Sequence, residues 1–237
     1  MDLLRAVIVG AAGTPYHDGL FFFDVSFPST YPNEPPKVQY RSGGLRLNPN
    51  MYACGKVCLS LLNTWGGKVE ERWNPKKSTM LQVLVSIQAL VLNAKPFFNE
   101  PGFESMAGKV EGEKKSLLYN ETTFMLSCRT MLFSLKNPPK HFEEYVAVHF
   151  RARAEDIIGA CQAYRKGAQV GCLTEGEVSC SSNFKVQLGT MVKTLVEAFI
   201  KNGSKASLFS TQMKNMSSTS HGTRKNRGRG GPSKSKF

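Results

Sequence analysis

The first forty residues alternate between short apolar runs and segments of turn-forming residues. The runs over 5–9 and 20–27 are rich in β-branched and aromatic side chains, and they flank a loop over 10–19 that is full of turn formers. This pattern predicts an antiparallel hairpin with a long loop. A proline-rich segment over 27–36 then leads to a short strand over 37–40. Because proline fixes φ and has no N–H donor, we expect that segment to run along a sheet edge or over the surface.

The spacing of apolar residues changes to that of a helix at Thr79. Over 80–91, apolar side chains lie almost all round the predicted helix. Thr79 and Gln82 have the spacing of an N-terminal capping box, and Lys95-Pro96 ends the pattern. A helix that is apolar on all sides is normally buried, so we expect this to be the buried central helix of the domain.

Two longer amphipathic patterns follow, and both predict helices. Apolar residues recur at helical spacing over 124–135 and over 142–164. A prolyl pair at 138–139 separates the two, and Gly167 is a C-terminal stop signal. A weaker amphipathic pattern over 190–200 predicts a last helix. The chain thus combines an antiparallel sheet with helices, which is the α+β class.

The composition changes near the end of the chain. From residue 203 the sequence is rich in Ser, Lys, Gly and Arg and cannot supply an apolar core, so we expect a disordered tail. The net charge of the chain is +13, but nine positive charges follow Glu197, after which there is no acidic residue, and +4 remains for everything before. The basic signal therefore belongs mostly to the tail, whose Arg-Gly pattern makes RNA a candidate partner.

No apolar run approaches the roughly 20 residues that a membrane-spanning helix needs. The N-terminus also lacks the organisation of a signal peptide. We therefore expect a protein with no membrane span that resides in the cytoplasm, the nucleus or both. The six cysteines are scattered along the chain, which favours reduced thiols in such a compartment.

Two of the cysteines, Cys54 and Cys58, compete for a chemical role. As a metal half-site they would need two further ligands, and the histidines show no pairing at ligand spacing, so we expect no metal site. Cys128 and Cys161 lie on apolar helix faces, which is typical of small core residues. The polar segment over 66–72, between the two tryptophans, predicts a surface insertion whose tryptophans anchor loops.

Four short motifs along this framework resemble those of one known family. They are Tyr31-Pro32-Asn33-Glu34-Pro35-Pro36, Asn48-Pro49-Asn50, Gly55-Lys56-Val57-Cys58-Leu59 and Trp73-Asn74-Pro75. Taken together, they resemble the proline loop, the His-Pro-Asn corner, the cysteine motif and the Trp-x-Pro motif of the ubiquitin-conjugating enzyme (UBC) family. The resemblance covers about Met1 to Lys166.

Three further features resemble one subclass of that family, the large hybrid conjugating enzymes that also serve as their own ligase. The features are a long insertion after Leu62, the sequence Tyr119-Asn120-Glu121, and the segment Pro138-Pro139-x-x-Phe142-Glu143. The subclass implies transfer of ubiquitin without a separate ligase.

The resemblance implies a UBC-like α+β fold, an antiparallel meander sheet packed on a central helix with C-terminal helices. Family members open with a helix and a further strand ahead of the first strand of this chain, so we expect an N-terminally truncated form of the fold. The expected division is a UBC core over 1–110, C-terminal helices over 111–167, a linker with a weak helix over 168–202, and a disordered basic tail over 203–237.

The resemblance also implies a transferase of the ubiquitination pathway. Cys58 would be an accessible nucleophile that accepts ubiquitin as a thioester from an activating enzyme and passes it to a lysine of a protein substrate. ATP is used by the activating enzyme, and this chain is expected to bind no cofactor. Asn50 either stabilises the oxyanion of the transfer step or holds the active-site loop, to which Asn48 and Pro49 belong. Glu100 would be the acidic gate that orients the incoming lysine.

Two loops are expected to bind partner proteins, one through Asn33 and Pro35 and the other through Asn74 and Pro75. Many family members present a large apolar residue to a ligase where this chain has Asn33, which weakens the case for a separate ligase. Asn48 stands where the family usually has His, and we expect its amide to shape the loop by similar hydrogen bonds.

Two other functions stay open at this point. The chain could be a non-catalytic UBC-fold interaction module or a truncated product, which the absent front helix favours. It could also be an RNA-binding protein that acts through its basic tail. The presence of Cys58 together with Asn50 favours the transferase.

Overall fold

A three-stranded antiparallel sheet organises the fold. Its strands are β1 (Leu3–Val9), β2 (Leu20–Ser26) and β3 (Lys37–Tyr40), hydrogen-bonded in that order. The structure is a computed structural model, and it describes residues 3–172 and 180–209. The predicted hairpin with its long loop is confirmed, and so is the short third strand.

The middle strand, β2, is buried on both faces and divides the molecule into two apolar clusters. Successive side chains of a strand point to opposite faces. Leu20 and Phe22 therefore join a cluster with the three long helices, whereas Phe21 and Phe23 join a second cluster with α1 and the loop that carries Cys58. The sheet thus holds the helical layer and the candidate site in a fixed relation.

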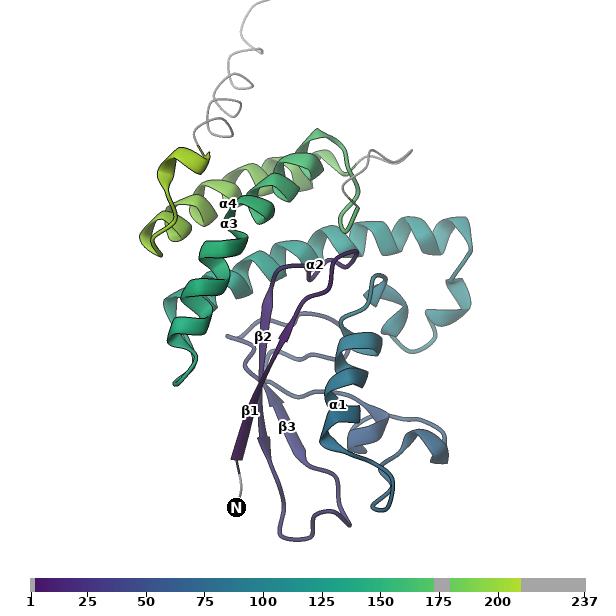
Figure 1. The fold of residues 1–237 in the computed structure, drawn as a ribbon. Coiled ribbons are helices and arrows are strands. Elements are labelled where there is room, and N and C mark those ends of the chain that lie inside the picture. Colours follow the sequence, from purple (N-terminus) through teal and green to yellow (C-terminus); the bar gives the residue numbers. More distant parts are fainter. Residues whose placement is uncertain (1–2, 173–179, 210–237) are drawn as a thin grey trace, which may run out of the picture.

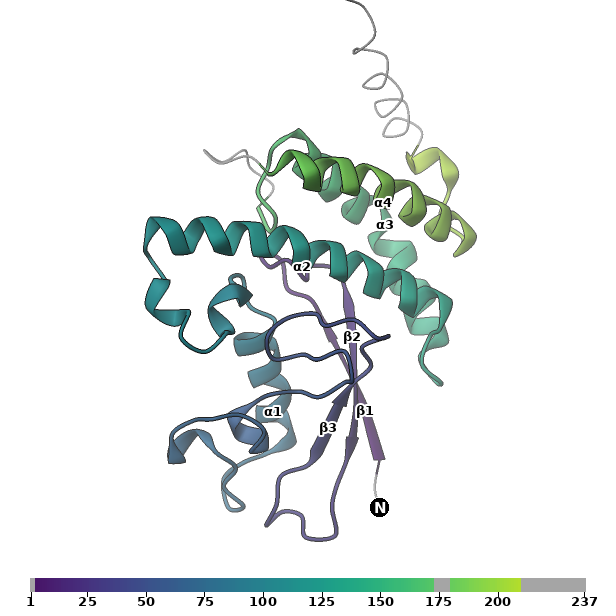
Figure 2. The same cartoon turned by 180° about the vertical axis from the view of Figure 1, so that it is seen from behind.

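Four α-helices follow the sheet (Figure 1). They are α1 (Met80–Ser86), which continues as a π-helical turn over Ile87–Val91, α2 (Val110–Lys136), α3 (Glu143–Lys166) and α4 (Ser182–Lys201). In both views α1 lies beside the sheet, α2 crosses the ends of β1 and β2, and α3 and α4 lie beyond α2 (Figures 1 and 2). Short 3-10 turns lie at Ser60–Leu62, Val69–Glu71, Pro96–Asn99, Glu104–Met106 and Ala206–Phe209.

Helix α1 begins at the predicted capping box but is not buried on all sides. Thr79 Oγ1 accepts from Gln82 N, and Gln82 Oε1 accepts from Thr79 N, as the sequence predicted. Leu81, Val85 and Leu90, however, are 69%, 52% and 61% exposed. The prediction of a helix buried all round is therefore wrong, because a three-stranded sheet covers one face of the helix and no other described element covers the opposite face.

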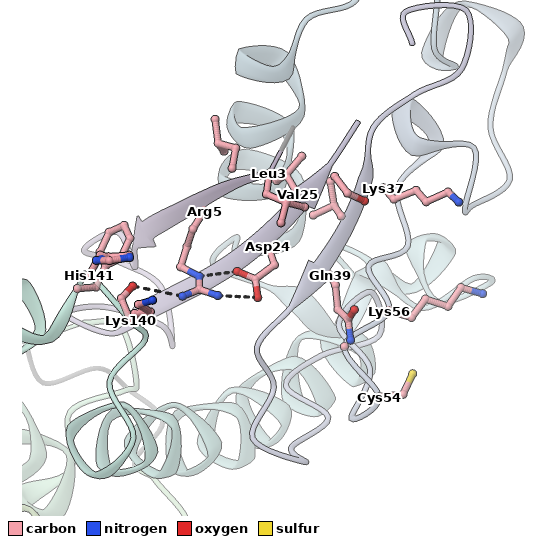
Figure 3. Close-up of a pocket in the computed structure, with 15 residues that line it drawn as sticks. Leu3, Arg5, Asp24, Val25, Lys37, Gln39, Cys54, Lys56, Lys140 and His141 are labelled. Atoms are coloured by element: carbon pink, nitrogen blue, oxygen red, sulfur yellow. Dashed lines mark hydrogen bonds and ion pairs between the residues drawn. The ribbon is translucent and has the colours of Figure 1, made fainter. Parts of the chain in front are cut away.

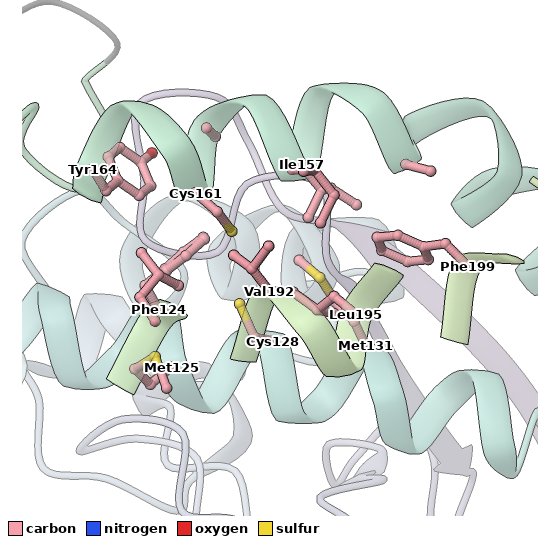
Figure 4. Close-up of a cluster of buried hydrophobic side chains, with 14 of the residues drawn as sticks. Phe124, Met125, Cys128, Met131, Ile157, Cys161, Tyr164, Val192, Leu195 and Phe199 are labelled. Atoms are coloured by element: carbon pink, nitrogen blue, oxygen red, sulfur yellow. The ribbon is translucent and has the colours of Figure 1, made fainter. Parts of the chain in front are cut away.

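Helices α2, α3 and α4 pack together around a second core that is rich in aromatic and sulfur-containing side chains (Figure 4). Cys128 and Cys161 are both fully buried there, which confirms them as core residues. The weak helix predicted over 190–200 is instead a 20-residue helix, α4, with six buried apolar side chains. The prediction of a linker over 168–202 is wrong for this helix, because its apolar face completes the core between α2 and α3.

The segment Tyr119-Asn120-Glu121 of α2 joins this helical layer to its neighbours. Asn120 Nδ2 donates to Ala94 O at 2.8 Å, and the Glu121 carboxylate accepts from Ser181 N at 2.7 Å and from Ser181 Oγ at 2.6 Å. Ser181 is the N-cap of α4, so Glu121 fixes the start of that helix.

The first residues of the predicted tail are folded. The turn Ala206–Phe209 packs on the helical core, and Phe209 is only 1% exposed. The prediction that disorder begins at 203 is therefore wrong for 203–209, because an aromatic side chain ends the turn and is buried. Residues 210–237, which hold most of the predicted disordered and RNA-binding tail, lie outside the described residues.

The insertion between Cys58 and α1 is exposed at most positions from 63 to 72, as predicted. Trp73 closes it: its indole Nε1 donates to Pro32 O at 2.7 Å, and its ring lies against Tyr31. Trp73 is thus a loop anchor, as expected. No helix within the described part of the chain is long and apolar enough to cross a membrane.

Candidate active site

The loop that carries Cys58 is set against strand β3 by a glycine turn. Gly55 has a φ of 90°, and a Cβ added there would lie 2.6 Å from Tyr40 O, so only glycine fits. The turn lets Tyr40 N donate to Gly55 O at 2.7 Å. Cys58 follows three residues later in the same loop.

Asn50 braces Cys58 through two hydrogen bonds across the loop. Cys58 N donates to Asn50 O at 2.8 Å, and Asn50 Nδ2 donates to Cys58 O at 3.0 Å. The sequence left two roles open for Asn50, and this arrangement is the loop-holding one, because the amide N–H is directed at the backbone of Cys58. Thr64 braces the other side: its hydroxyl donates to Val57 O at 2.7 Å and accepts from Leu59 N at 3.0 Å.

Asn48 joins this loop to two distant elements. Its Nδ2 donates to Tyr16 Oη and to Val91 O, both at 3.0 Å, and its Oδ1 accepts from Asn50 N at 2.8 Å. Tyr16 belongs to the hairpin loop, and Val91 ends the π-helical turn after α1. The prediction that the amide shapes the loop by hydrogen bonding is confirmed. Pro49, between the two asparagines, is buried with them.

The two competing cysteines lie in different surroundings. Cys58 is 2% exposed, whereas Cys54 is exposed and lines an open groove of about 1050 Å³ on the sheet, together with Lys56 and the Arg5–Asp24 ion pair (Figure 3). The expectation of an accessible Cys58 is therefore wrong for this structure, in which the residue is almost fully buried. The bracing by Asn50 and Thr64, by contrast, surrounds Cys58 and not Cys54.

Burial raises the pKa of the Cys58 thiol above its ordinary value, because a desolvated thiolate is disfavoured. Three neighbours act in the opposite direction. Lys56 and Arg46 supply positive charge, and the Tyr52 side chain supplies a hydrogen bond. The exposed Cys54 slightly opposes them. The thiol is thus protonated at rest but lies among groups that stabilise its anion.

Glu100 reaches this site from a separate loop. It follows the turn Pro96–Asn99, which is anchored because Asn99 Nδ2 donates to Leu90 O at 3.1 Å and Phe97 is buried. The Glu100 carboxylate lies 3.9 Å from Arg46 Nη2. Arg46 thus contacts Glu100, and its charge is also one of those that lower the pKa of the Cys58 thiol.

The residues predicted to bind partner proteins lie on two loops that touch. Asn33 and Pro35 belong to the proline loop, and Asn74 and Pro75 follow Trp73, whose indole is bonded to Pro32. Asn33, Asn74 and Pro75 are exposed, and Pro35 is half-buried. The two loops thus form one continuous surface.

Sequence reasoning missed four residues that shape the site: Arg46, Tyr52, Thr64 and Tyr119. Tyr52 could have been found, because Asn48, Asn50 and Tyr52 stand two residues apart on a buried corner. Arg46 has the same spacing on the other side of Asn48, and Thr64 lies five residues after Leu59, so only Tyr119 is brought in by the fold alone. Within 3–172 and 180–209, no cluster of three or more His, Cys, Asp or Glu side chains is placed to hold a metal ion.

Comparisons with known proteins point to the same family as the four motifs. A family model described as "Ubiquitin-conjugating enzyme" matches residues 1–129. The chain is similar to two Arabidopsis thaliana proteins named "Probable ubiquitin-conjugating enzyme E2 26" and "Probable ubiquitin-conjugating enzyme E2 25", with 57% identity over 213 residues and 56% over 212. Each match covers 86% of this chain.

The chain spans only 39% and 35% of the lengths of those two plant proteins, and 65% of a further Arabidopsis thaliana relative that is 57% identical. It is also 44% identical over 168 residues to the Homo sapiens protein named "Dual E2 ubiquitin-conjugating enzyme/E3 ubiquitin-protein ligase BIRC6". That match covers 69% of this chain and 4% of the human protein.

Proposed function

Because the chain belongs to the ubiquitin-conjugating enzyme family, we propose that it is a transferase that carries ubiquitin as a thioester on Cys58 and passes it to lysines of protein substrates. The partners are ubiquitin, an activating enzyme that consumes ATP, and the substrates. The observation that carries the proposal is the bracing of Cys58 by Asn50 on one side and by Thr64 on the other.

In the first step the Cys58 thiolate attacks the carbonyl carbon of the thioester that joins ubiquitin to the activating enzyme. The new C–S bond forms as the old one breaks, and the thiol of the activating enzyme leaves. Lys56, Arg46 and Tyr52 favour the thiolate, which offsets part of the cost of burial. The loop must open around Cys58 for this step, since the thiol is buried at rest.

In the second step the amine of a lysine attacks the thioester carbonyl. An isopeptide C–N bond forms, the C–S bond breaks with Cys58 leaving as its thiolate, and the proton lost by the amine passes to that thiolate through solvent. Glu100 is the carboxylate that receives the incoming ammonium or amine group by hydrogen bonding. Asn50 keeps the loop in register, because its amide is bonded to Cys58 O.

We propose further that the transfer proceeds without a separate ligase. Support comes from the resemblance of Tyr119-Asn120-Glu121 and Pro138-Pro139 to the hybrid subclass, and from the 44% identity to a relative that is named as a dual enzyme. Asn33, on the exposed partner-binding loops, lacks the large apolar side chain that is typical of binding hot spots.

A non-catalytic interaction module is the second candidate function. The observation that favours it is the 2% exposure of Cys58, because a thiol that stays buried cannot accept ubiquitin. The two functions differ in one measurable property, the ability to form the thioester.

The test is to incubate the chain with activating enzyme, ATP and ubiquitin and to separate the products without reducing agent. We expect an adduct that a thiol reductant removes. Cys58→Ser should abolish it or replace it by a reductant-resistant ester, whereas the matched variant Cys54→Ser should keep it. The reverse pattern of the two variants would assign the reaction to Cys54, and the absence of any adduct on the wild type would favour the interaction module.

Ligase-free transfer has its own measurement. With the same components and no ligase, we expect ubiquitin to become attached to lysines of the chain or of an added protein in a reductant-resistant form. A charged Cys58 that discharges only after a ligase is added would contradict this part of the proposal alone.

A further inference from the structure

We propose that Arg46 is a positioning residue for the transfer step, which holds the Glu100 carboxylate and the Tyr52 side chain in place around Cys58. The inference rests on the proposed function of Cys58 and assigns a role to a residue outside the four motifs. Arg46 stands two residues before Asn48, and its side chain is the only link that the described structure provides between the Cys58 loop and the Glu100 carboxylate.

Two contacts place the guanidinium between these groups. Arg46 Cζ lies 4.7 Å from the centroid of the Tyr52 ring, which is a cation–π geometry. Arg46 Nη2 lies 3.9 Å from Glu100 Oε2, at the outer limit of an ion pair. A planar guanidinium can make both contacts at once, because a face can stack on a ring while the N–H groups at the edge stay available to a carboxylate.

The backbones on both sides of the link are fixed. Leu47, next to Arg46, is 1% exposed, and Leu47 N donates to Met51 O at 3.1 Å. On the other side Phe97 is buried, and Asn99 is bonded to the end of α1. Only the long side chains are free, since those of Arg46 and Glu100 are 54% and 43% exposed. Their mutual contact therefore favours one position of the carboxylate over its other rotamers.

Such a contact contributes little to the stability of the fold. An exposed ion pair is screened by water and restricts two long side chains. The value of Arg46 is therefore positional: a carboxylate held at one place meets the attacking lysine more often in a productive geometry than one that samples many rotamers. The role of Arg46 in transfer can therefore be tested by substitution, because loss of the side chain should not unfold the protein.

The surrounding charges agree with this role. The groups that act on Cys58 are Lys56, Tyr52, Arg46 and Cys54, and Arg46 is one of the two cations among them. The charges of Arg46 and Glu100 also act on Tyr119 of α2, in opposite directions. Burial raises the pKa of Tyr119 to about 12, so its hydroxyl stays neutral. Arg46 is thus the cationic partner that Glu100 shares with the thiol.

The first experiment measures discharge of the preformed thioester. After charging is stopped, free lysine or hydroxylamine is added and the decay of the adduct is followed for wild type, Arg46→Ala, Arg46→Lys and Arg41→Ala. Arg41 is the matched control, since it is a half-exposed arginine whose acidic neighbour is Asp24, at 3.8 Å, and not Glu100. Hydroxylamine is unprotonated at neutral pH, so its attack should not depend on the Glu100 carboxylate.

We expect Arg46→Ala to slow discharge to lysine about threefold, the scale of an exposed ion pair, and Arg46→Lys to slow it by less, because lysine keeps the charge and loses the planar stacking. Arg46→Ala should discharge to hydroxylamine near the wild-type rate. The control Arg41→Ala should discharge to lysine near the wild-type rate. Glu100→Gln should also slow lysine discharge, and adding Arg46→Ala to Glu100→Gln should cause no further loss. Equal slowing with both nucleophiles, or additive effects of the two substitutions, would overturn the proposal.

The second experiment needs no ubiquitin and so separates this proposal from the proposed function. Alkylation of Cys58 by iodoacetamide is followed against pH by peptide mass analysis in a Cys54→Ser background. Arg46→Ala should move the profile to higher pH, because it removes a nearby cation and releases Tyr52. An unchanged profile would overturn the placement of Arg46 even if charging succeeds. Failure of the wild type to form the thioester would instead refute the proposed function, and with it the role of Arg46 in transfer.

Discussion

Asn48 offers a sharp test of how the candidate site is held, because one side chain ties together three parts of the chain. Replacement by Leu keeps the size and removes three hydrogen bonds, those to Tyr16 Oη, Val91 O and Asn50 N. Each neutral hydrogen bond contributes about 1 kcal/mol net, and its buried partners then remain unsatisfied. With Asn48 only 1% exposed, the expected loss in the free energy of unfolding is roughly 3–5 kcal/mol.

Asn48→His is the informative companion, because histidine is the residue that the family usually has at this position. A neutral imidazole has one donor and one acceptor and can keep two of the three bonds, so the expected loss is about 1 kcal/mol. Urea unfolding at constant pH gives both values. Asn33→Leu on the exposed proline loop is the control and should change stability by less than about 0.5 kcal/mol. An Asn48→Leu variant as stable as this control would refute the reasoning.

Two further predictions concern α4 and the thiol. Glu121→Ala removes two charge-assisted bonds to Ser181, so we expect the free energy of local unfolding of α4 to fall by about 3 kcal/mol. Protease cleavage near the start of α4 should then increase, and Glu121→Gln should have a smaller effect. Equal cleavage of wild type and Glu121→Ala would contradict the capping role. Because the pKa of Cys58 is raised, its thiolate becomes common only above the pH at which an ordinary cysteine ionises. Its alkylation rate should therefore still be rising with pH at the point where an ordinary cysteine has reached its plateau. A plateau near neutral pH would show that the cations outweigh burial.

The exposed apolar face of α1 shows one limit of sequence reasoning. The hydrophobic pattern over 80–91 places apolar side chains on every side, and burial is the usual consequence. In the structure Val83 and Ile87 are fully buried, whereas Leu81 and Val85 face outward. How many elements surround a helix is decided by the number of strands and by the path of the other helices, which the local pattern does not contain.

Helix α4 shows the opposite error, an element underestimated. Phe184 and Leu188 lie one helical turn apart, ahead of the range that was expected to be helical, and continue the same apolar face. That spacing could have extended the prediction. Its partner could not have been found, because Glu121 lies 60 residues from Ser181 in the chain and nothing local to either residue indicates the contact.

The sequence by itself determined the local geometry of the site. The motifs that contain Asn50, Gly55 and Cys58 act over short distances along the chain: a glycine with positive φ, and hydrogen bonds between residues eight apart. Such contacts depend on residue type and spacing, so the fold class, the helical capping box and the loop around Cys58 could be predicted.

Only the tertiary structure decided how reactive and how accessible that site is. The burial of Cys58, the bond from Asn48 to Val91 and the meeting of Arg46 with Glu100 join residues that are far apart in the sequence. Desolvation and charge act through space and not along the chain, so the pKa of the thiol and the place of the Glu100 carboxylate follow from packing. The sequence names the candidate nucleophile, and the fold sets the surroundings of its thiol.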